Sequence, residues 1–245
     1  MALPPFTPRL GDHAEALLAT LRTLGTPARA VAEKRYLKSE LTHLGVPVPL
    51  VRKTVLSSVK GQGAMDPARL WDLVADLWRP AIHESRLSAV LLLEAYGDLL
   101  VPNDMDQLEP MIRQARTWGL LDTLAVHGLG KLVANFPGPL GKVLDRFARD
   151  PDFWVRRCAL LALLLPLRQG GGDFARFGRY ADAMLEEKEF FIRKAIGWVL
   201  RETAKQNPAI VIAWLLPRKT RASGLTLREA CKHLPTEEKR KILGK

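Results

Sequence analysis

The sequence has few cysteines, few aromatic side chains and no long apolar run. Its two cysteines, Cys158 and Cys231, lie in periodic apolar stretches, which indicates buried thiols in a reducing compartment rather than disulfides or a thiolate metal site. The longest apolar run, residues 160–167, is about half of the roughly 18 residues that cross a bilayer. The first residues lack a basic start followed by an apolar stretch, so we expect no secretory signal, no membrane association and a cytoplasmic protein.

Acidic residues are also scarce relative to basic ones. The 245 residues contain 37 Lys and Arg against 26 Asp and Glu, a formal net charge of +11. Such an excess favours a polyanionic partner, with nucleic acid first and a membrane surface second. Residues 201–245 hold eleven of the basic residues and four Glu, and a solvated basic tail would account for part of this excess.

Alternating strand patterns are absent, and helical periodicity dominates. Apolar residues recur at three- and four-residue spacing in stretches such as HAEALLATLRTL and ARLWDLVADLW, and prolines and glycines fall between these stretches. Asp66-Pro67 and Asp150-Pro151 are typical of helix starts, with a capping side chain followed by proline at the first helical position. The sequence therefore predicts an all-α protein.

A small residue recurs at a nearly constant interval along the chain. The positions are Thr54, Ala89, Ala125, Ala159, Ala195 and Ala230, and the successive spacings are 35, 36, 34, 36 and 35. A helix pair with its turns has about this length, and stacked helices need small residues where they approach closely. We predict a right-handed α-solenoid of six or seven HEAT-like helix pairs with a concave basic groove; a globular helical bundle is the alternative. The domain covers residues 11–245 after a flexible arm of residues 1–10.

Arginines hold a fixed place in this repeat. Arg52, Arg157, Arg193 and Arg228 each precede the small residue by two positions, and Arg86 precedes Ala89 by three. Because packed helices lie roughly 8–10 Å apart, these side chains would form a ladder that a phosphate backbone can meet. The alternative is that each arginine pairs with an acid of a neighbouring repeat, although acids do not recur at a matching position.

The third repeat has Thr123 where the arginine is expected, and Asp122 precedes it. Trp118 lies four residues before Asp122, one turn away on the same helix face, and Trp198 follows Ala195 by three residues. An acid beside a phosphate-binding ladder weakens binding, so Asp122 either faces elsewhere or takes part in chemistry. The plainer interpretations are a helix-surface acid and tryptophans that pack in the core.

Four stretches carry a resemblance to a known family: KRYLKSELTHLGVPVPLVRK, WGLLD, FWVRRCAL and EFFIRKAIGWVLRETAKQNP. They resemble the AlkD-type DNA alkylation repair glycosylases over residues 28–208. The resemblance implies a HEAT-like solenoid that removes cationic alkylated purines, such as 7-methylguanine and 3-methyladenine, from duplex DNA in base excision repair. It also implies hydrolysis by water with no lyase step.

Carried over residue by residue, the resemblance implies a catalytic Asp122 with Trp118, Trp198 and Arg157 in the active site. The residues expected to contact DNA are Tyr36, Arg52, Arg86, Arg156, Arg193, Lys194 and Arg228. Arg157 is also expected to hold a phosphate bidentately. The family commonly has an SWWDTVD-like string where this chain has TWGLLD, so Gly119, Leu120 and Leu121 change the polarity beside Asp122.

Other chemistries find no support in the residues. The five histidines are scattered without HxxxH spacing, CxxC is absent, and no P-loop or dinucleotide fingerprint occurs. We therefore expect no metal, no cofactor and a monomer without an obligate protein partner, which associates with the nucleoid when it binds DNA. Two functions remain as alternatives: a non-catalytic protein that binds damaged or branched DNA, and a protein-interaction solenoid.

Overall fold

The computed structural model of the chain describes residues 11–60 and 63–244. Within these residues the chain is helical throughout, with a single isolated bridge between Thr42 and Ile82 instead of strands. The all-α prediction is therefore confirmed, while the handedness and number of the repeats stay predictions. None of the described helices has the length and apolar character that crossing a membrane requires.

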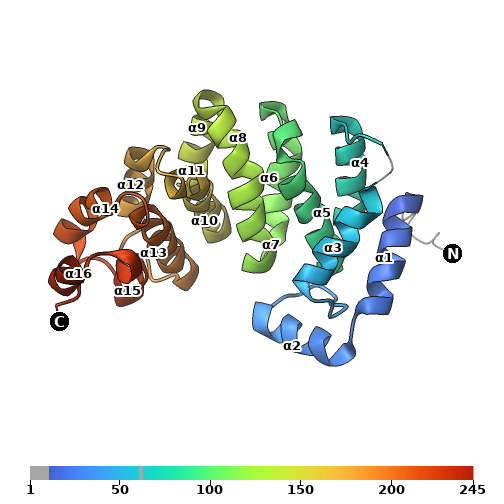
Figure 1. Cartoon of the computed structure of the whole chain (residues 1–245), viewed down its shortest axis with the longest axis horizontal. Coiled ribbons are helices and arrows are strands. Elements are labelled where there is room, and N and C mark those ends of the chain that lie inside the picture. The colour runs from blue at the N-terminus through green and yellow to red at the C-terminus, as the bar shows by residue number, and fades with distance from the viewer. Residues whose placement is uncertain (1–10, 61–62, 245) are drawn as a thin grey trace. The chain divides into compact units, whose positions relative to one another are not determined.

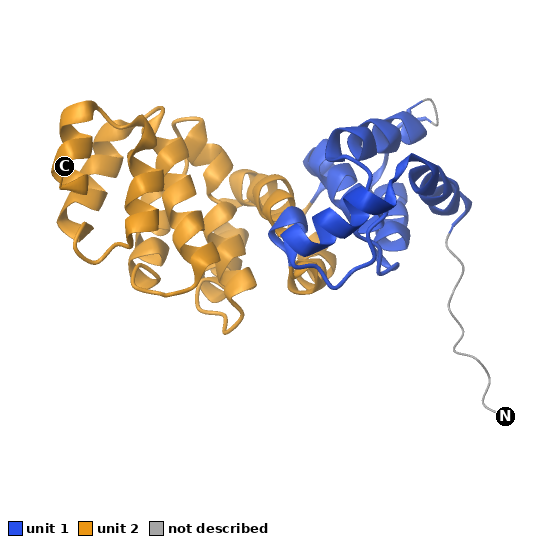
Figure 2. Cartoon of the chain, turned by 90° about the horizontal axis from the view of Figure 1, so that it is seen from below, with its two compact units in different colours: residues 1–100, 117–120 blue, residues 101–116, 121–245 orange. Residues whose placement is uncertain are grey.

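The chain forms two compact units (Figure 2). Unit 1 comprises residues 1–100 and 117–120, and unit 2 comprises residues 101–116 and 121–245. The arm predicted for residues 1–10 lies outside the described residues, and the single domain predicted for residues 11–245 stays a prediction.

Unit 1 contains five α-helices and a short 3-10 turn among its described residues (Figure 1). These are α1 (Asp12–Leu24), α2 (Pro27–Leu37), α3 (Val48–Val59), α4 (Pro67–Trp78), α5 (His83–Ala95) and η1 (Gly97–Leu99). Asp66 caps α4 by accepting a hydrogen bond from the Arg69 amide, as the Asp-Pro pair predicts. Helix α5 packs against both α3 and α4, whereas α2 has no buried side chain.

Unit 2 continues the helical pattern to the C-terminal end of the described residues (Figure 1). Its elements are η2 (Pro102–Asp104), α6 (Met105–Ala115), η3 (Leu124–Leu129), α8 (Gly130–Asn135), α9 (Pro137–Phe147), α10 (Phe153–Leu161), α11 (Leu164–Arg168), α12 (Phe174–Ala183), α13 (Phe190–Ala204), α14 (Pro208–Leu215), η4 (Leu216–Arg218), α15 (Gly224–Ala230), η5 (Cys231–His233) and α16 (Thr236–Leu243). Helix α7 (Trp118–Thr123) contains residues of both units.

The helix start predicted at Asp150-Pro151 is wrong. Helix α10 begins at Phe153, and its cap is Asp152, which accepts a hydrogen bond from the Trp154 amide. Asp150 instead accepts hydrogen bonds from Arg113 and from the Asp152 amide. The ion pair and the loop therefore take the carboxylate that would otherwise cap the helix.

The recurring small residues lie in the core. All five alanines of the repeat frame are fully buried: Ala89, Ala125, Ala159, Ala195 and Ala230. In unit 2 they lie in consecutive packed elements, because α10 contacts η3 and α13, and α13 contacts α15. The two thiols are free and fully buried as well. The frame thus marks the positions where one helix pair packs on the next.

Polar side chains also join positions about one repeat apart. Arg113 donates to Asp150 over 37 residues, Tyr180 to Asp145 over 35 and Arg218 to Asp182 over 36. Since the repeat is about 35 residues long, a partner at this separation belongs to the neighbouring repeat. These contacts hold neighbouring repeats together, and none of them involves an arginine that precedes a small residue of the frame.

Helix α13 approaches α15 closely at Gly197. A Cβ atom there would lie 2.6 Å from the Glu229 Cβ and 3.1 Å from the Thr226 carbonyl oxygen, both on α15. Both contacts involve backbone or the first side-chain carbon, so a side-chain rotation does not relieve them. Gly197 therefore sets the distance between the two helices.

We expect Gly197→Ala to lower the free energy of unfolding by about 1–3 kcal/mol, because the added methyl group overpacks the α13–α15 contact. Gly138→Ala is the matched control, since a Cβ at this helical glycine meets no atom within 4 Å, and it should raise stability by about 0.5 kcal/mol. Urea unfolding followed by circular dichroism measures both. Equal stability of Gly197→Ala and the wild type would contradict this view of the packing.

Candidate active site

Helix α7 carries two of the residues that the sequence singles out, Trp118 and Asp122, one helical turn apart. The helix runs directly into the π-helical segment η3, where the Gly130 amide bonds to the Ala125 carbonyl five residues earlier. π-Helical turns are rare and are frequently found at functional sites. The backbone thus departs from regular α-helix immediately after Asp122.

The carboxylate of Asp122 forms a bidentate ion pair with Arg157 on α10. Arg157 Nε donates to Asp122 Oδ1 and Arg157 Nη2 to Oδ2, each at 2.8 Å. The Arg157 side chain is 3% exposed and the Asp122 side chain 17% exposed. The fork of the guanidinium therefore fixes the position and orientation of a carboxylate that solvent still reaches.

Arg157 has a third anchor on α13. Its Nη1 donates to the Phe191 carbonyl, and its guanidinium carbon lies 5.7 Å from the Phe191 ring centroid. The predicted phosphate contact is therefore corrected: the guanidinium is buried, and its donors are occupied by Asp122 and a backbone carbonyl. Arg157 positions Asp122 rather than binding a phosphate.

Two opposing effects act on Asp122. Burial raises the pKa of Asp122 above its ordinary value, and the hydrogen bonds and charge of Arg157 offset only part of this rise. The guanidinium is always protonated, so its two hydrogen bonds to the carboxylate favour the ionised form of Asp122. Each carboxylate oxygen keeps a lone pair after accepting one bond from arginine, which leaves Asp122 able to orient a water molecule.

Aromatic side chains that the sequence analysis does not assign surround this anchor. Phe191 lies 4.7 Å from Trp154, 6.3 Å from Phe153 and 5.3 Å from Phe190, between ring centroids. Phe190 is 55% exposed. In the sequence, this cluster corresponds to two pairs of adjacent aromatic residues, Phe153-Trp154 and Phe190-Phe191, at the starts of α10 and α13. The first pair precedes Arg157 and the second precedes Arg193, which occupy the same position in the repeat.

Trp198 lies on α13, seven residues after Phe191, and is half-buried. A separation of seven residues places both side chains on one face of the helix. Asp122, Arg157 and Phe191 are thus brought together by direct contacts in unit 2, and Trp198 shares a helix face with the last of them.

In unit 1, Tyr36 packs edge-on against Trp118, with ring centroids 5.5 Å apart and an interplanar angle of 88°. Tyr36 lies in the last turn of α2 and is 72% exposed. Leu37 lies beside the same segment, because a Cβ on Gly119 would lie 3.2 Å from Leu37 Cδ2. The structure therefore brings the two predicted aromatic residues of this unit into contact.

Some of the arginines assigned to DNA have structural partners. Arg86 donates through Nε to the carbonyls of Trp78 and Pro80. Arg156 donates to the carbonyls of Asp150 and Pro151 and pairs with Glu187 through two further bonds. Arg156 and Arg157 pair with acids 31 and 35 residues away, which is the alternative of an acid in a neighbouring repeat. Arg86 instead bonds to carbonyls six and eight residues earlier in the chain.

The other assigned cations are more exposed. Arg52 pairs with Glu94 on α5 and its side chain is 41% exposed, while Lys194 pairs with Glu229 and is 38% exposed. Arg193 is half-buried and donates through Nε to the Glu187 carbonyl, and Arg228 is exposed. An exposed ion pair contributes only about 0–1 kcal/mol, so a phosphate can replace Glu94 beside Arg52 at little cost. Glu229, the partner of Lys194, is buried.

Comparison with known proteins agrees with this arrangement. A family model described as DNA alkylation repair enzyme matches residues 17–234. The chain belongs to this family. No curated protein matches the sequence.

Three solved structures share the fold. A predicted DNA alkylation repair enzyme from Enterococcus faecalis is 23% identical, with a TM-score of 0.76 over 86% of this chain and 97% of that one. AlkD2 from Streptococcus mutans is 14% identical, with a TM-score of 0.61 over 92% of this chain and 100% of that one. The protein Smu.31 from S. mutans UA159 is also 14% identical, with a TM-score of 0.60 over 91% of this chain and 100% of that one. A role in the repair of alkylated DNA follows from the family.

We expect Arg157→Met to lower the free energy of unfolding at neutral pH by about 3–5 kcal/mol, because it leaves Asp122 charged and unpaired. Burial then raises the pKa of Asp122 without opposition, so protonation at acid pH relieves the penalty and the loss should be smaller at pH 5 than at pH 8. Arg52→Met, which breaks an exposed pair, should cost less than about 1 kcal/mol. Similar losses for the two variants in urea unfolding would contradict the positioning role of Arg157.

The environment of Glu229 predicts a second pH dependence of the stability of this protein. Burial alone would raise the pKa of Glu229, but the hydrogen bonds from Lys232 and Lys194 outweigh it and lower the pKa to about 2. An acid whose pKa is lowered by folding stabilises the protein above its unfolded pKa of about 4.5, and this stabilisation is lost as the pH falls toward 2. Arg201 on α13 also donates to Glu229.

We therefore expect Glu229→Gln to lower the free energy of unfolding at pH 7 by on the order of 3 kcal/mol, and by less than half of this at pH 3. Glu237→Gln is the control, because Glu237 is 79% exposed in its pair with Lys241 and its loss should cost less than about 1 kcal/mol. Denaturant unfolding across this pH range measures both. A difference between Glu229→Gln and the wild type that is independent of pH would exclude the charged network as its cause.

Proposed function

We propose that the protein is a monofunctional DNA glycosylase that hydrolyses the N-glycosidic bond of cationic alkylated purines in duplex DNA. The observation that carries the proposal is the solvent-accessible Asp122 carboxylate, fixed by a buried bidentate arginine in a chain of the DNA alkylation repair enzyme family. The reaction releases bases such as 7-methylguanine and 3-methyladenine.

The positive charge of the substrate base reduces the catalytic assistance that the protein must supply. A purine alkylated at N3 or N7 carries a positive charge, so the base is a good leaving group and needs no strong general acid. As the glycosidic bond breaks, positive charge develops on the sugar, and a fixed carboxylate stabilises it electrostatically. The same carboxylate orients the water that adds to the sugar and accepts its proton.

Asp122 fits this role because Arg157 holds both of its oxygens. A carboxylate that is already oriented does not reorganise during the reaction, which is the basis of electrostatic catalysis. The pair also prevents Asp122 from rotating toward a DNA phosphate, since such a rotation would leave a buried guanidinium unpaired. Arg157 therefore acts as a positioning residue.

We assign Trp118 and Trp198 to recognition of the cationic base. A tryptophan face attracts a cation by roughly 0.5–2 kcal/mol, which favours the alkylated base over its neutral parent. Both side chains are half-buried, so each retains surface for a ligand. Tyr36, in contact with Trp118, supports that ring.

The phosphate contacts fall to the more exposed cations. Arg52, Arg193, Lys194 and Arg228 have accessible side chains, whereas Arg86 and Arg156 hold backbone carbonyls. Phosphate contacts position a protein on a duplex without reading its sequence. Recognition mainly through the duplex backbone suits an enzyme whose substrate is a lesion rather than a sequence.

The test is excision from methylated duplex DNA, with released 7-methylguanine and 3-methyladenine measured by chromatography. We expect the wild type to release them and Asp122→Asn to lose about a hundredfold or more of the rate, because asparagine keeps an acceptor for Arg157 but carries no charge. Duplex affinity should be retained. Asp106→Asn, an exposed acid in the same unit, is the matched control and should retain full activity.

Two results would change the assignment. Tight duplex binding by the wild type with no base released would favour a non-catalytic DNA-binding protein. Full excision by Asp122→Asn, with its fold intact by circular dichroism, would show that another group supplies the negative charge.

A further inference from the structure

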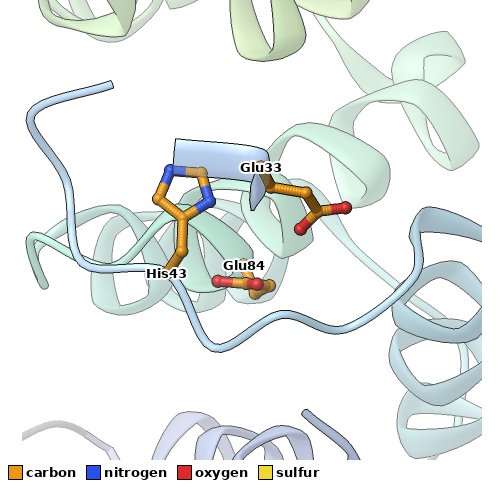
Figure 3. Close-up of side chains that lie close together, drawn as sticks. All are labelled: Glu33, His43 and Glu84. Carbon is orange, nitrogen blue, oxygen red and sulfur yellow. The ribbon is translucent and has the colours of Figure 1, made fainter. Parts of the chain in front are cut away.

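A second cluster of polar side chains lies in unit 1. Glu33 on α2, His43 on the loop after α2 and Glu84 on α5 approach one another (Figure 3), and the nearest oxygen or nitrogen atoms of the three residues all lie within 4.8 Å of each other. The residues are separated by 10 and 41 positions in the sequence. The proposed glycosylase chemistry uses none of them.

The imidazole of His43 has no hydrogen-bond partner within the described residues. It is 8% exposed, and both ring nitrogens are buried. The ring stacks on His83 with centroids 4.4 Å apart and an angle of 8°, and backbone hydrogen bonds between Thr42 and residues 81 and 83 fix this stack. A buried polar atom without a hydrogen-bond partner destabilises the folded protein, so the two ring nitrogens of His43 call for a ligand that the described side chains do not supply.

Glu84 is a buried carboxylate with unused acceptor capacity. It is 1% exposed, its Oε1 accepts from the Gly45 and Val46 amides, and its Oε2 accepts from the Leu44 amide alone. A carboxylate offers about four lone-pair positions, so Oε2 retains one. In the part of the chain that the structure describes, no lysine or arginine forms an ion pair with Glu84.

Glu33 is the adjustable member of the cluster. Its side chain is 20% exposed and pairs with Arg29 one turn earlier on α2 through Oε1, which leaves Oε2 available. A partly exposed ion pair at this spacing on a helix is weak, so Arg29 is a weak competitor for the carboxylate.

We propose that Glu33, His43 and Glu84 bind one divalent transition-metal ion of the zinc class. An imidazole with two carboxylates suits such an ion, and a water molecule completes four-coordination. Donor atoms in a tetrahedral zinc site lie about 3.3 Å apart. Those of the cluster lie within 4.8 Å of one another, so binding requires them to approach by at most about 1.5 Å. The ion gives the buried His43 nitrogen a partner and offsets the charge of Glu84.

The proposed ion contributes to the position of α2 within unit 1. This helix has no buried side chain, so apolar packing contributes little to its position. An ion shared by Glu33, His43 and Glu84 connects α2 with the following loop and with α5. The site is structural, and it lies on the helix that also carries Tyr36.

The experiment uses the full chain without an affinity tag, after treatment with a chelator. Zinc chloride is titrated by calorimetry, and cobalt chloride is titrated by visible absorption, which reports the coordination number of the ion. We expect one ion per chain at micromolar concentration, a cobalt spectrum typical of four-coordination and a higher melting temperature with zinc. Absence of saturable binding at micromolar zinc would overturn the proposal.

Variants locate the site. Glu33→Gln should weaken zinc binding at least about tenfold with the metal-free protein folded, and His43→Phe, which keeps a ring for the stack on His83, should abolish it. Glu40→Gln, an exposed glutamate on the same loop, is the control and should bind as the wild type. Zinc binding that survives in both Glu33→Gln and His43→Phe would place the ion elsewhere and refute the assignment. Base excision is not a readout, so the outcome is independent of the glycosylase proposal.

Discussion

The buried ion pair between Asp122 and Arg157 is the constraint on which the site depends. It joins α7 to α10, and the third bond of Arg157, to the Phe191 carbonyl, joins both to α13. A buried charge is costly unless it is paired, so neither partner can leave without leaving the other unpaired. One guanidinium thus aligns three consecutive repeats and orients the carboxylate at the same time.

The repeat arithmetic predicts the packing well because it depends on a local requirement. Where helices of successive repeats approach, only a small side chain fits, and the five alanines at that position are fully buried. The ends of individual elements are less predictable. Asp66 caps α4, but Asp150 forms an ion pair with Arg113, and nothing in the local sequence distinguishes the two Asp-Pro pairs.

The spacing of the arginines in the repeat does not by itself predict whether each one binds DNA or pairs with an acid. Arg52, Arg157 and Arg193 occupy the same place in the repeat, yet Arg157 is buried in an ion pair while Arg52 is largely exposed. The difference arises from the partner one repeat away. In the third repeat Thr123 stands where the arginine is expected, and Asp122, one position earlier, binds Arg157 over 35 residues. The break in the ladder at Thr123 is visible in the sequence, and the Asp122–Arg157 pair explains why it is tolerated.

The departure of this chain from the family string also has a physical basis in unit 1. A Cβ on Gly119 would lie 3.2 Å from Leu37 and 3.6 Å from His83, so an aromatic side chain there would displace the end of α2. Glycine at this position lets Leu37 pack against the start of α7 and keeps the His43–His83 stack undisturbed. Because α2 has no buried side chain of its own, this contact, the Tyr36–Trp118 pair and the Glu33–His43–Glu84 cluster together determine where it lies. Gly119, one of the residues that differ from the family string, therefore affects how α2 and Tyr36 are placed in unit 1, whereas Arg157 holds Asp122.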